Sequence, residues 1–289
     1  MKTVNSLSGG KTSSYIAKHY PADHNIFALV RTDDVNCMFP DKKLRQIVSD
    51  KIGKEFIGTL EMDDIIYTML DLEQFIGQEI TWVSGQSFDE IIIRRSGENG
   101  NLRKYLPNVV LRFCTQEMKV RPINDWWFEN VKETVEMRIG FRANEMNRAK
   151  SMIEKCDENQ ILWDKAIIGK TKTGNKNKWK SFPMRKPVFP LIDDSIFKDK
   201  IEEYWKDKPV RFAYKNNCVG CFHRNEMLLK HMSEKEPNKF DWFVEQEKTS
   251  RSNRGWRMGI TYEKIKKFKS QFDLFDDDFN DCDSGYCGL

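Results

Sequence analysis

The 289-residue sequence lacks a long apolar run and has no strong excess of charge of one sign. No apolar segment approaches the roughly 18 residues needed to span a membrane. The N-terminus has the pattern of a strand, not of a positively charged signal segment. The net charge of +4 is too small to indicate a nucleic-acid partner by itself. These absences predict a soluble, cytoplasmic protein without a membrane partner.

The chain also lacks the even cysteine count of a disulfide framework. In a reducing compartment, seven cysteines favour metal or redox chemistry. They are Cys37, Cys114, Cys156, Cys218, Cys221, Cys282 and Cys287. With 39% apolar residues, the chain can bury a large core as one elaborated domain, or as one domain and a smaller one. We expect a nucleotide-binding α/β domain over residues 1–190 and a mainly helical, cysteine-bearing region over residues 191–289.

A glycine- and hydroxyl-rich stretch follows the predicted strand Thr3–Leu7 and precedes a predicted helix over residues 13–20. Adjacent glycines let a backbone approach a ligand closely, and a helix start favours an anion. An ordinary capped surface turn would need only one hydroxyl. The stretch therefore predicts a phosphate-binding loop. Its expected ligand-binding residues are Ser8, Gly9, Gly10, Lys11, Thr12 and Ser13.

Two classes of phosphate loop compete for this stretch. A Walker A loop would require glycine at position 5, where the chain has Asn5. The stretch instead resembles the S-G-G-x-D-S loop of the PP-loop nucleotide enzymes, with Thr12 where that family usually has aspartate. The resemblance implies an adenosine nucleotide as ligand, with Mg as a further candidate. The departure at Thr12 counts against the metal handling of ATP-splitting members.

Several polar residues are expected near this loop. A second buried strand, predicted over residues 26–30, ends at Thr32 and Asp33, and the carboxyl ends of parallel strands share one edge of a sheet. Their alternative role is to end a strand in water. A strand over residues 134–139 leads to Arg142 and Arg148, which can make bidentate contacts to phosphate or sulfate.

Two cysteine segments indicate metal or redox chemistry. Cys114 is flanked by Arg112, Lys119 and Arg121, which would favour its thiolate, although a buried structural cysteine is equally compatible. In Cys218-Val219-Gly220-Cys221, the glycine lets both sulfurs turn toward one ion, as in zinc and iron–sulfur sites. Pairing of two core cysteines is the alternative reading of that turn.

Five motifs occur in the order found in the phosphoadenosine phosphosulfate (PAPS) reductase family. They are the loop, C-T-x-x-x-K-V-x-P from Cys114, G-F-R-x-x-E-x-x-R-A from Gly140, Pro190-Leu191, and C-x-x-C. Residues 3–225 resemble the phage- and bacterial-type PAPS reductase-like branch. The resemblance implies a Rossmann-like (HUP-type) parallel sheet with flanking helices, which binds ATP, PAPS or adenylyl sulfate (APS). It also implies Lys119 as a nucleotide-binding residue.

The resemblance also implies roles for the cysteines. Three of the family's cluster ligands are matched, by Cys114, Cys218 and Cys221. Family members with a cluster have a Cys-Cys pair at the first position, where this chain has Phe113 before Cys114. A fourth ligand such as Cys282 would therefore complete an iron–sulfur or zinc site. Cys287-Gly288-Leu289 is similar to the tail that carries the nucleophilic cysteine of PAPS reductases, which need a thiol donor such as thioredoxin. Nearby carboxylates would raise the pKa of a Cys287 thiol. Alternatively, Cys282 and Cys287 complete a four-cysteine site, or the tail is simply frayed.

Residues 170–186 hold seven basic residues and no acid, with Trp179 and Phe182 between them. We expect a mobile loop, either solvated or in contact with nucleic acid through its aromatic rings. A second basic set surrounds Trp256. Its members are Lys248, Arg251, Arg254 and Arg257.

Three functions therefore remain open. The first is a PAPS reductase-like enzyme of sulfur chemistry. The second is a PP-loop ATP pyrophosphatase that adenylates a nucleic-acid base or a small molecule for sulfur or amine insertion. The third is a non-catalytic nucleotide-binding protein with a structural metal site.

Overall fold

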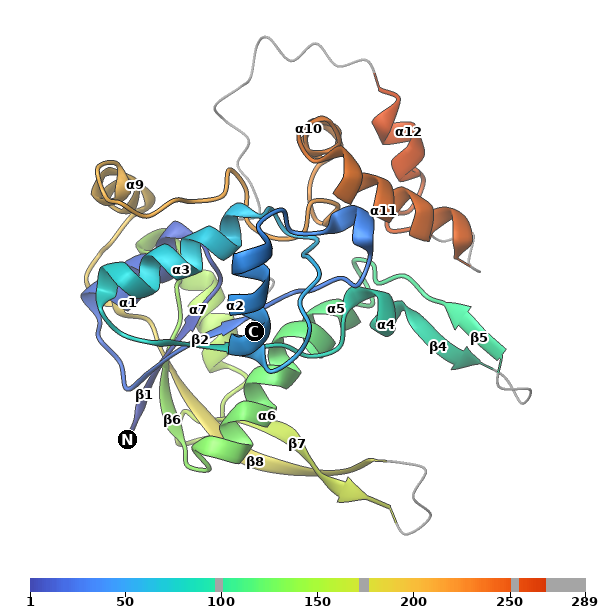
Figure 1. The fold of residues 1–289 in the computed structure, drawn as a ribbon. Helices are drawn as coiled ribbons and strands as arrows, with labels where there is room; N and C mark the ends of the chain where they lie inside the picture. The colour runs from blue at the N-terminus through green and yellow to red at the C-terminus, as the bar shows by residue number, and fades with distance from the viewer. Residues whose placement is uncertain (97–100, 172–176, 251–254, 269–289) are drawn as a thin grey trace.

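The computed structural model describes residues 1–96, 101–171, 177–250 and 255–268 (Figure 1). The strands are β1 (Thr3–Leu7), β2 (His24–Ala28), β3 (Ile80–Val83), β4 (Ile93–Ser96), β5 (Asn101–Lys104), β6 (Val135–Arg138), β7 (Leu162–Lys170) and β8 (Asn177–Val188). The helices are α1 (Lys11–His19), α2 (Lys42–Ile52), α3 (Asp64–Ile76), α4 (Phe88–Ile92), α5 (Phe113–Thr115), α6 (Arg121–Asn130), α7 (Met146–Ile153), α8 (Pro190–Asp193), α9 (Lys198–Trp205), α10 (Glu226–Lys235), α11 (Pro237–Thr249) and α12 (Tyr262–Lys266). Short turns are the 3₁₀ turns η1 (Val35–Cys37) and η3 (Ala143–Glu145) and the π-helical turn η2 (Gln116–Val120).

A six-stranded, mostly parallel sheet forms the centre of the fold, in the order β3-β2-β1-β6-β8-β7. All neighbours pair in parallel except β7, which runs antiparallel to β8. The chain moves outward from β1 to β3 and then returns to β6 on the other side of β1. In open sheets of this kind, ligands bind beyond the strand ends where the order reverses. The α/β sheet with flanking helices confirms the predicted class and is compatible with a Rossmann-like fold.

Helices cover both faces of the sheet, because consecutive strand residues alternate between two cores. On β2, Phe27 belongs to the core formed with α1, α3 and α9, whereas Ile26 and Ala28 belong to the core formed with α6 and α7. Such strands are apolar on both sides. The return of the chain to α9 brings Trp205 against α1, where its Nε1–H donates to the Lys11 carbonyl at 2.9 Å.

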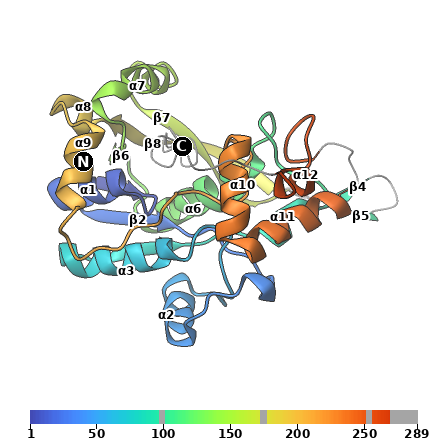
Figure 2. The same cartoon turned by 90° about the horizontal axis from the view of Figure 1, so that it is seen from above.

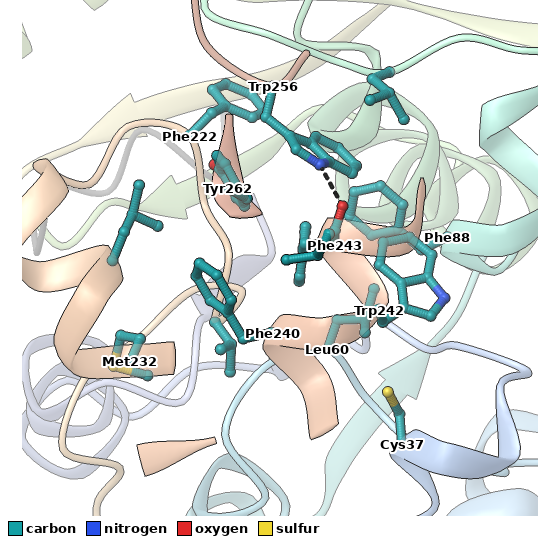
Figure 3. Packing of buried hydrophobic residues seen from close by; sticks show 14 of the residues in the cluster. Cys37, Leu60, Phe88, Phe222, Met232, Phe240, Trp242, Phe243, Trp256 and Tyr262 are labelled. Carbon is teal, nitrogen blue, oxygen red and sulfur yellow. Dashed lines mark hydrogen bonds between the residues drawn. The ribbon is translucent and has the colours of Figure 1, made fainter. Parts of the chain in front are cut away.

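A third core lies around α10, α11 and α12, which group together at the end of the molecule opposite α1 and α9 (Figures 1 and 2). Its centre is aromatic (Figure 3). Trp256 and Tyr262 are fully buried there, and Trp256 Nε1–H donates to the Phe243 carbonyl at 2.9 Å. Leu60 and Phe88 of the N-terminal half pack into the same core. The boundary between residues 190 and 191 remains a prediction.

Local signals predicted several of these elements. The strand Thr3–Leu7 occurs at the predicted bounds. Helix α2 begins at Lys42, because the Asp41 carboxylate caps it by accepting from the amides of Lys43 and Leu44. The second strand was predicted two residues too late, since β2 ends at Ala28 and the chain then bends so that Thr32 N bonds the Gly58 carbonyl.

The prediction of a loop over residues 170–186 is wrong. Strand β7 continues to Lys170, and β8 occupies residues 177–188, so the basic segment forms a long hairpin apart from residues 172–176, which lie outside the described part. The base of β8 pairs in parallel with β6, from Arg185 opposite Val135 to Val188 opposite Arg138. Strands β4 and β5 pair antiparallel in a separate two-stranded sheet.

Within the described ranges, no helix combines the length and the apolar character that crossing a membrane would require.

Candidate functional site

The loop of residues 8–13 connects β1 to α1 at the reversal point of the sheet. Gly9 has a φ of +74°, and an added Cβ would lie 2.8 Å from Ile65 Cγ2, so both conformation and space require glycine. Gly10 is the N-cap of α1, and no side chain in the described part caps this helix. The first backbone N–H groups of α1 are therefore left to a ligand or to water.

The serines of the loop stabilise its shape. Ser13 is buried, its Oγ donates to the Gly10 carbonyl at 3.1 Å, and it accepts from the Ser8 amide at 3.1 Å. The two hydroxyl oxygens lie 3.2 Å apart. The structure thus gives Ser13 an internal bond across the loop, which the sequence could not distinguish from contact with a ligand. The ammonium of Lys11 forms an ion pair with Glu202 of α9.

Two distant segments converge on this loop. After β6, Gly140 lies against the first turn of α1, since an added Cβ would be 3.5 Å from Thr12 Cγ2 and 4.0 Å from the Ser13 nitrogen. On another side, an added Cβ at Gly10 would overlap the side-chain amide of Asn216. Asn216 precedes Cys218 by two positions. The loop is therefore next to the segment that begins the C-x-x-C turn.

The two predicted anion-binding arginines share one carboxylate. Arg142 donates to Glu145 Oε2 through its backbone nitrogen at 2.9 Å and through Nε at 3.0 Å, and Arg148 pairs with the other oxygen. Burial raises the pKa of Glu145, but the hydrogen bonds and charge of the two arginines outweigh it and lower the pKa overall. The guanidinium of Arg148 also lies 4.2 Å from the centroid of the Phe141 ring. The turn after β6 therefore holds two guanidinium groups close to one carboxylate.

Thr32 and Asp33 lie in a polar network between the end of β2 and the start of α4. The buried Thr32 hydroxyl donates to Asp89 Oδ2 at 2.6 Å, and the same oxygen accepts from the Asp33 amide at 2.8 Å. The Asp33 carboxylate accepts from Ser87 Oγ at 2.5 Å and from Arg31 Nη1 at 2.6 Å. These bonds fix the strand end, and contact of either residue with a nucleotide remains a prediction.

Cys114, Cys218 and Cys221 line one small cavity of about 30 Å³. Cys114 comes from α5, which continues into the π-helical turn η2, and the other two come from the C-x-x-C turn. Turns of this π type are frequent at functional sites. The sequence prediction placed these three cysteines together, and they do share a cavity. The other two cysteines of the prediction, Cys282 and Cys287, lie outside the described part of the chain.

The rest of the cavity wall is partly apolar and partly cationic. Four aromatic rings contribute to it, and all four are labelled in Figure 3: Phe88, Phe222, Phe243 and Trp256. Lys119 also lines the cavity, and its ammonium lies 3.0 Å from Oε1 of the buried Glu61. A further lining residue, His223, has its pKa lowered by burial and then by the charges of Arg112 and Arg257, so its imidazole is neutral at pH 7. The lining thus combines aromatic rings with a buried ion pair and a neutral imidazole.

The C-x-x-C turn is held from several sides. The Cys221 amide donates to the Cys218 carbonyl at 3.0 Å, and the Gly220 carbonyl accepts from the buried Tyr262 hydroxyl at 3.0 Å. An added Cβ at Gly220 would overlap the Phe243 ring. These contacts explain why the residue before Cys221 is glycine and why α11 and α12 belong to the site.

Arg224 fixes the segment just before the turn. It is 2% exposed, and its guanidinium donates to the carbonyls of Asn216 at 2.6 Å, Asn217 at 3.3 Å and Cys218 at 3.2 Å. Asn217 has a φ of +70°, a left-handed conformation that asparagine tolerates. Sequence reasoning missed Asn216, His223 and Arg224. Their proximity to Cys218 and Cys221 in the chain was the only available signal.

In the described part of the chain, no group of three or more His, Cys, Asp or Glu side chains has the arrangement of a formed metal site. The donor chemistry nonetheless suits a soft metal, because three thiols and a neutral imidazole line the same cavity.

A larger cavity, of about 550 Å³, lies at the end of β3 and is lined by Trp82, Glu117, Arg121, Asp125 and Trp126, among others. None of the site residues predicted from the sequence lines this second cavity.

Comparison of the chain with protein-family models, with curated proteins and with solved structures found no match.

Proposed function

We propose that this protein binds the phosphates of an adenosine nucleotide at the 8–13 loop and carries out sulfur chemistry at the adjacent cysteine cavity. The observation that supports both halves together is the contact between Gly10 and Asn216. It joins the loop to the segment that carries Cys218, although the two are far apart in the sequence. A phosphate ligand and the cysteines would thus occupy neighbouring positions.

The nucleotide half rests on three features. The uncapped start of α1 offers backbone N–H groups, the glycines keep the approach open, and the turn after β6 carries the guanidinium groups of Arg142 and Arg148. Thr12, in the first turn of α1, stands where ATP-splitting PP-loop enzymes have an aspartate. A sulfonucleotide such as APS or PAPS is therefore favoured over ATP as the substrate.

The cysteine half rests on the shared cavity. Cys114, Cys218 and Cys221 would hold a zinc ion or an iron–sulfur cluster, with Cys282 as a candidate fourth ligand. The bound group would supply positive charge and would keep its thiol ligands deprotonated at neutral pH. The residues around the cavity would orient these thiols, above all Arg224 and Tyr262 through the backbone of the turn.

The reaction that we propose is reduction of the sulfate group. The thiolate of Cys287 would form a bond to the sulfate sulfur, the bond from that sulfur to the phosphate oxygen would break, and the nucleotide would leave with the electron pair. One thiolate of a dithiol such as thioredoxin would then attack Cys287 Sγ, forming a mixed disulfide and releasing sulfite, and the second thiolate would displace the Cys287 thiolate. The dithiol is oxidised to a disulfide while the sulfur gains two electrons, so the step balances.

An ATP pyrophosphatase acting on nucleic acid is the second candidate. The observation that favours it is the basic hairpin of β7 and β8, which carries exposed tryptophans. The two candidates differ in their preferred nucleotide, because only the pyrophosphatase requires ATP.

Calorimetric titration of APS, PAPS and ATP tests the proposal. Gly10→Ala should weaken binding of the preferred nucleotide by roughly 10- to 150-fold, since loss of charge-assisted contacts costs about 1.5–3 kcal/mol. The control is Gly77→Ala, at the end of α3, where φ is +68° and an added Cβ meets no atom within 4 Å. Unchanged affinity in folded Gly10→Ala would rule out the loop as the phosphate site.

The methyl group added by Gly10→Ala would also press on Asn216. The double variant Gly10→Ala/Asn216→Gly therefore separates two possible causes of weaker nucleotide binding. Continued weak binding shows that the methyl group itself blocks the phosphate. Recovery of binding shows that displacement of the 216–218 segment caused the loss.

A further inference from the structure

The hairpin of β7 and β8 carries an exposed cationic surface that the adenosine nucleotide site does not use. It extends away from the rest of the sheet (Figure 1), since only residues 185–188 of β8 pair with β6. Four exposed lysines lie along it: Lys165, Lys170, Lys178 and Lys180. Among the described residues, no carboxylate lies within ion-pair distance of any of these four ammonium groups. Their charge is therefore available to an anionic partner.

Two tryptophans are exposed on the same hairpin. The Trp163 side chain is 52% exposed and that of Trp179 is 43% exposed, which is unusual for such large rings. Neither ring is loose. Trp163 Nε1–H donates to Asp157 Oδ2 at 2.6 Å, and the guanidinium of Arg121 lies 5.2 Å from the centroid of the Trp179 ring. Each ring is anchored at one point and still accessible to solvent.

The strand register places rings and charge together. Residues directly opposite in an antiparallel pair project from the same face. Ile167 is opposite Trp179, and Lys165 is opposite Ser181, so Lys165 and Trp179 share one face with Trp163. Lys178 and Lys180 project from the other face. Lys178 and Lys180 flank Trp179 in the chain, so the ribbon carries exposed lysines on both faces next to an exposed ring.

Anchored, solvent-accessible indole rings between exposed lysines match the chemistry of an unpaired polynucleotide. Bases stack on aromatic rings irrespective of sequence, and lysines neutralise the phosphates that link them. A duplex would hide its base faces and use only the charge. An acidic polypeptide or an anionic membrane would likewise have no need of two separately anchored rings on a narrow ribbon.

We infer that the β7–β8 hairpin is a binding surface for single-stranded nucleic acid, with Trp163 and Trp179 as stacking platforms and the lysines as phosphate contacts. This surface is separate from the proposed nucleotide site and does not depend on it. Either site can be present without the other, so the two are tested by different ligands.

Fluorescence anisotropy with a labelled 20-nucleotide oligo-dT, in the full-length protein, tests the surface. Trp163→Ala and Trp179→Ala should each weaken binding by roughly 5- to 150-fold, because stacking contributes about 1–3 kcal/mol per base. The corresponding phenylalanine variants should retain most of the affinity, since they keep an aromatic face. The affinity for the preferred adenosine nucleotide, measured on the same samples, should not change in any of these variants.

The lysine contribution is measured from the salt dependence. Lys165→Gln/Lys178→Gln/Lys180→Gln should reduce the slope of log K against log salt by about 2, at roughly 0.7 per phosphate contact on a single strand. The matched control removes the same charge elsewhere. It is Lys42→Gln/Lys43→Gln/Lys155→Gln, at three exposed positions outside the hairpin.

Three results would overturn the inference. One is equal binding of a duplex of the same length with no loss in the tryptophan variants. Another is equal binding of poly-glutamate or of phosphatidylserine vesicles. The last is an equal loss in the control lysine variant, which would show that net charge alone is responsible.

Discussion

Replacement of Arg224 is the strongest test of how the cysteine turn is built. This arginine is almost completely buried and donates to three consecutive backbone carbonyls, those of residues 216–218. Arg224→Met keeps much of the side-chain volume but removes every donor. Three partly buried carbonyl groups would then lose a charged partner, and the segment between the 8–13 loop and Cys218 would lose its attachment.

The magnitude follows from the hydrogen-bond geometry. A hydrogen bond to a charged group contributes about 1.5–3 kcal/mol. Only the bond to Asn216 is short, at 2.6 Å, while the other two, at 3.2 and 3.3 Å, are near the upper limit for N–H···O bonds. We therefore expect Arg224→Met to lower the free energy of unfolding by about 3–4 kcal/mol, within the range for breaking a buried charged contact. Arg224→Lys should lose about half as much, because one ammonium cannot reproduce the planar fork.

Urea denaturation measures this loss, and nucleotide titration measures its consequence. The control is Arg211→Met, which removes an exposed arginine bonded to both oxygens of Asp71 at 2.7 Å. Because the Arg211 side chain is 59% exposed, its pair with Asp71 should contribute about 1 kcal/mol, which is less than we expect for Arg224. Arg224→Met should also weaken nucleotide binding, because Asn216 would no longer be held against Gly10. A loss of stability below about 1 kcal/mol would refute the assignment of Arg224 as the brace of this segment.

Two further predictions concern the metal and pH. The cavity cysteines are Cys114, Cys218 and Cys221, and the controls are Cys156 and Cys37, whose pKa burial raises to about 12. After anaerobic purification, replacement of each cavity cysteine by serine should lower the metal content to a similar degree, whereas replacement of either control cysteine should not. Full metal content in Cys114→Ser would exclude a shared centre. The second prediction concerns pH. Near pH 7, Glu145→Gln should have a lower free energy of unfolding than the parent protein, and this difference should disappear as the pH falls through the folded-state pKa of Glu145. That direction follows because Arg142 and Arg148 hold the pKa of Glu145 below its unfolded value of about 4.3. A difference that persists unchanged at pH 2 would contradict the ion-pair origin.

The 8–13 loop was predictable because its signals are local. Adjacent glycines after an apolar strand indicate a close-approach turn, and the structure has such a turn at this place. The orientation of a hydroxyl group is not a local property. Ser13 has the same side chain whether it points to a ligand or across the loop, and only the packing shows that it bonds the Gly10 carbonyl and the Ser8 amide.

The hairpin was mispredicted for a physical reason. Lysines, asparagines and glycine outnumber apolar residues over residues 170–186, and Pro183 and Pro187 both argue against a strand. Yet Pro183 lies at a register shift between Leu162 and Trp163, where the ladder is already interrupted and a missing N–H costs little. Met184, which is buried, holds the strand in the core. The many lysines therefore indicated correctly that the segment is exposed to solvent, but they did not indicate that its backbone forms a strand.

The contact between Gly10 and Asn216 could not be predicted from the sequence, because neither residue carries a pattern that names its partner. It is nevertheless the feature that connects the two halves of the proposed site. Asn216 touches the loop, and the Asn216 carbonyl is held by the same arginine that holds the Cys218 carbonyl. In the function that we propose, displacement of the loop by a bound phosphate would therefore act on a segment whose other end carries a cavity thiol. Nucleotide binding would then be coupled to the position of Cys218.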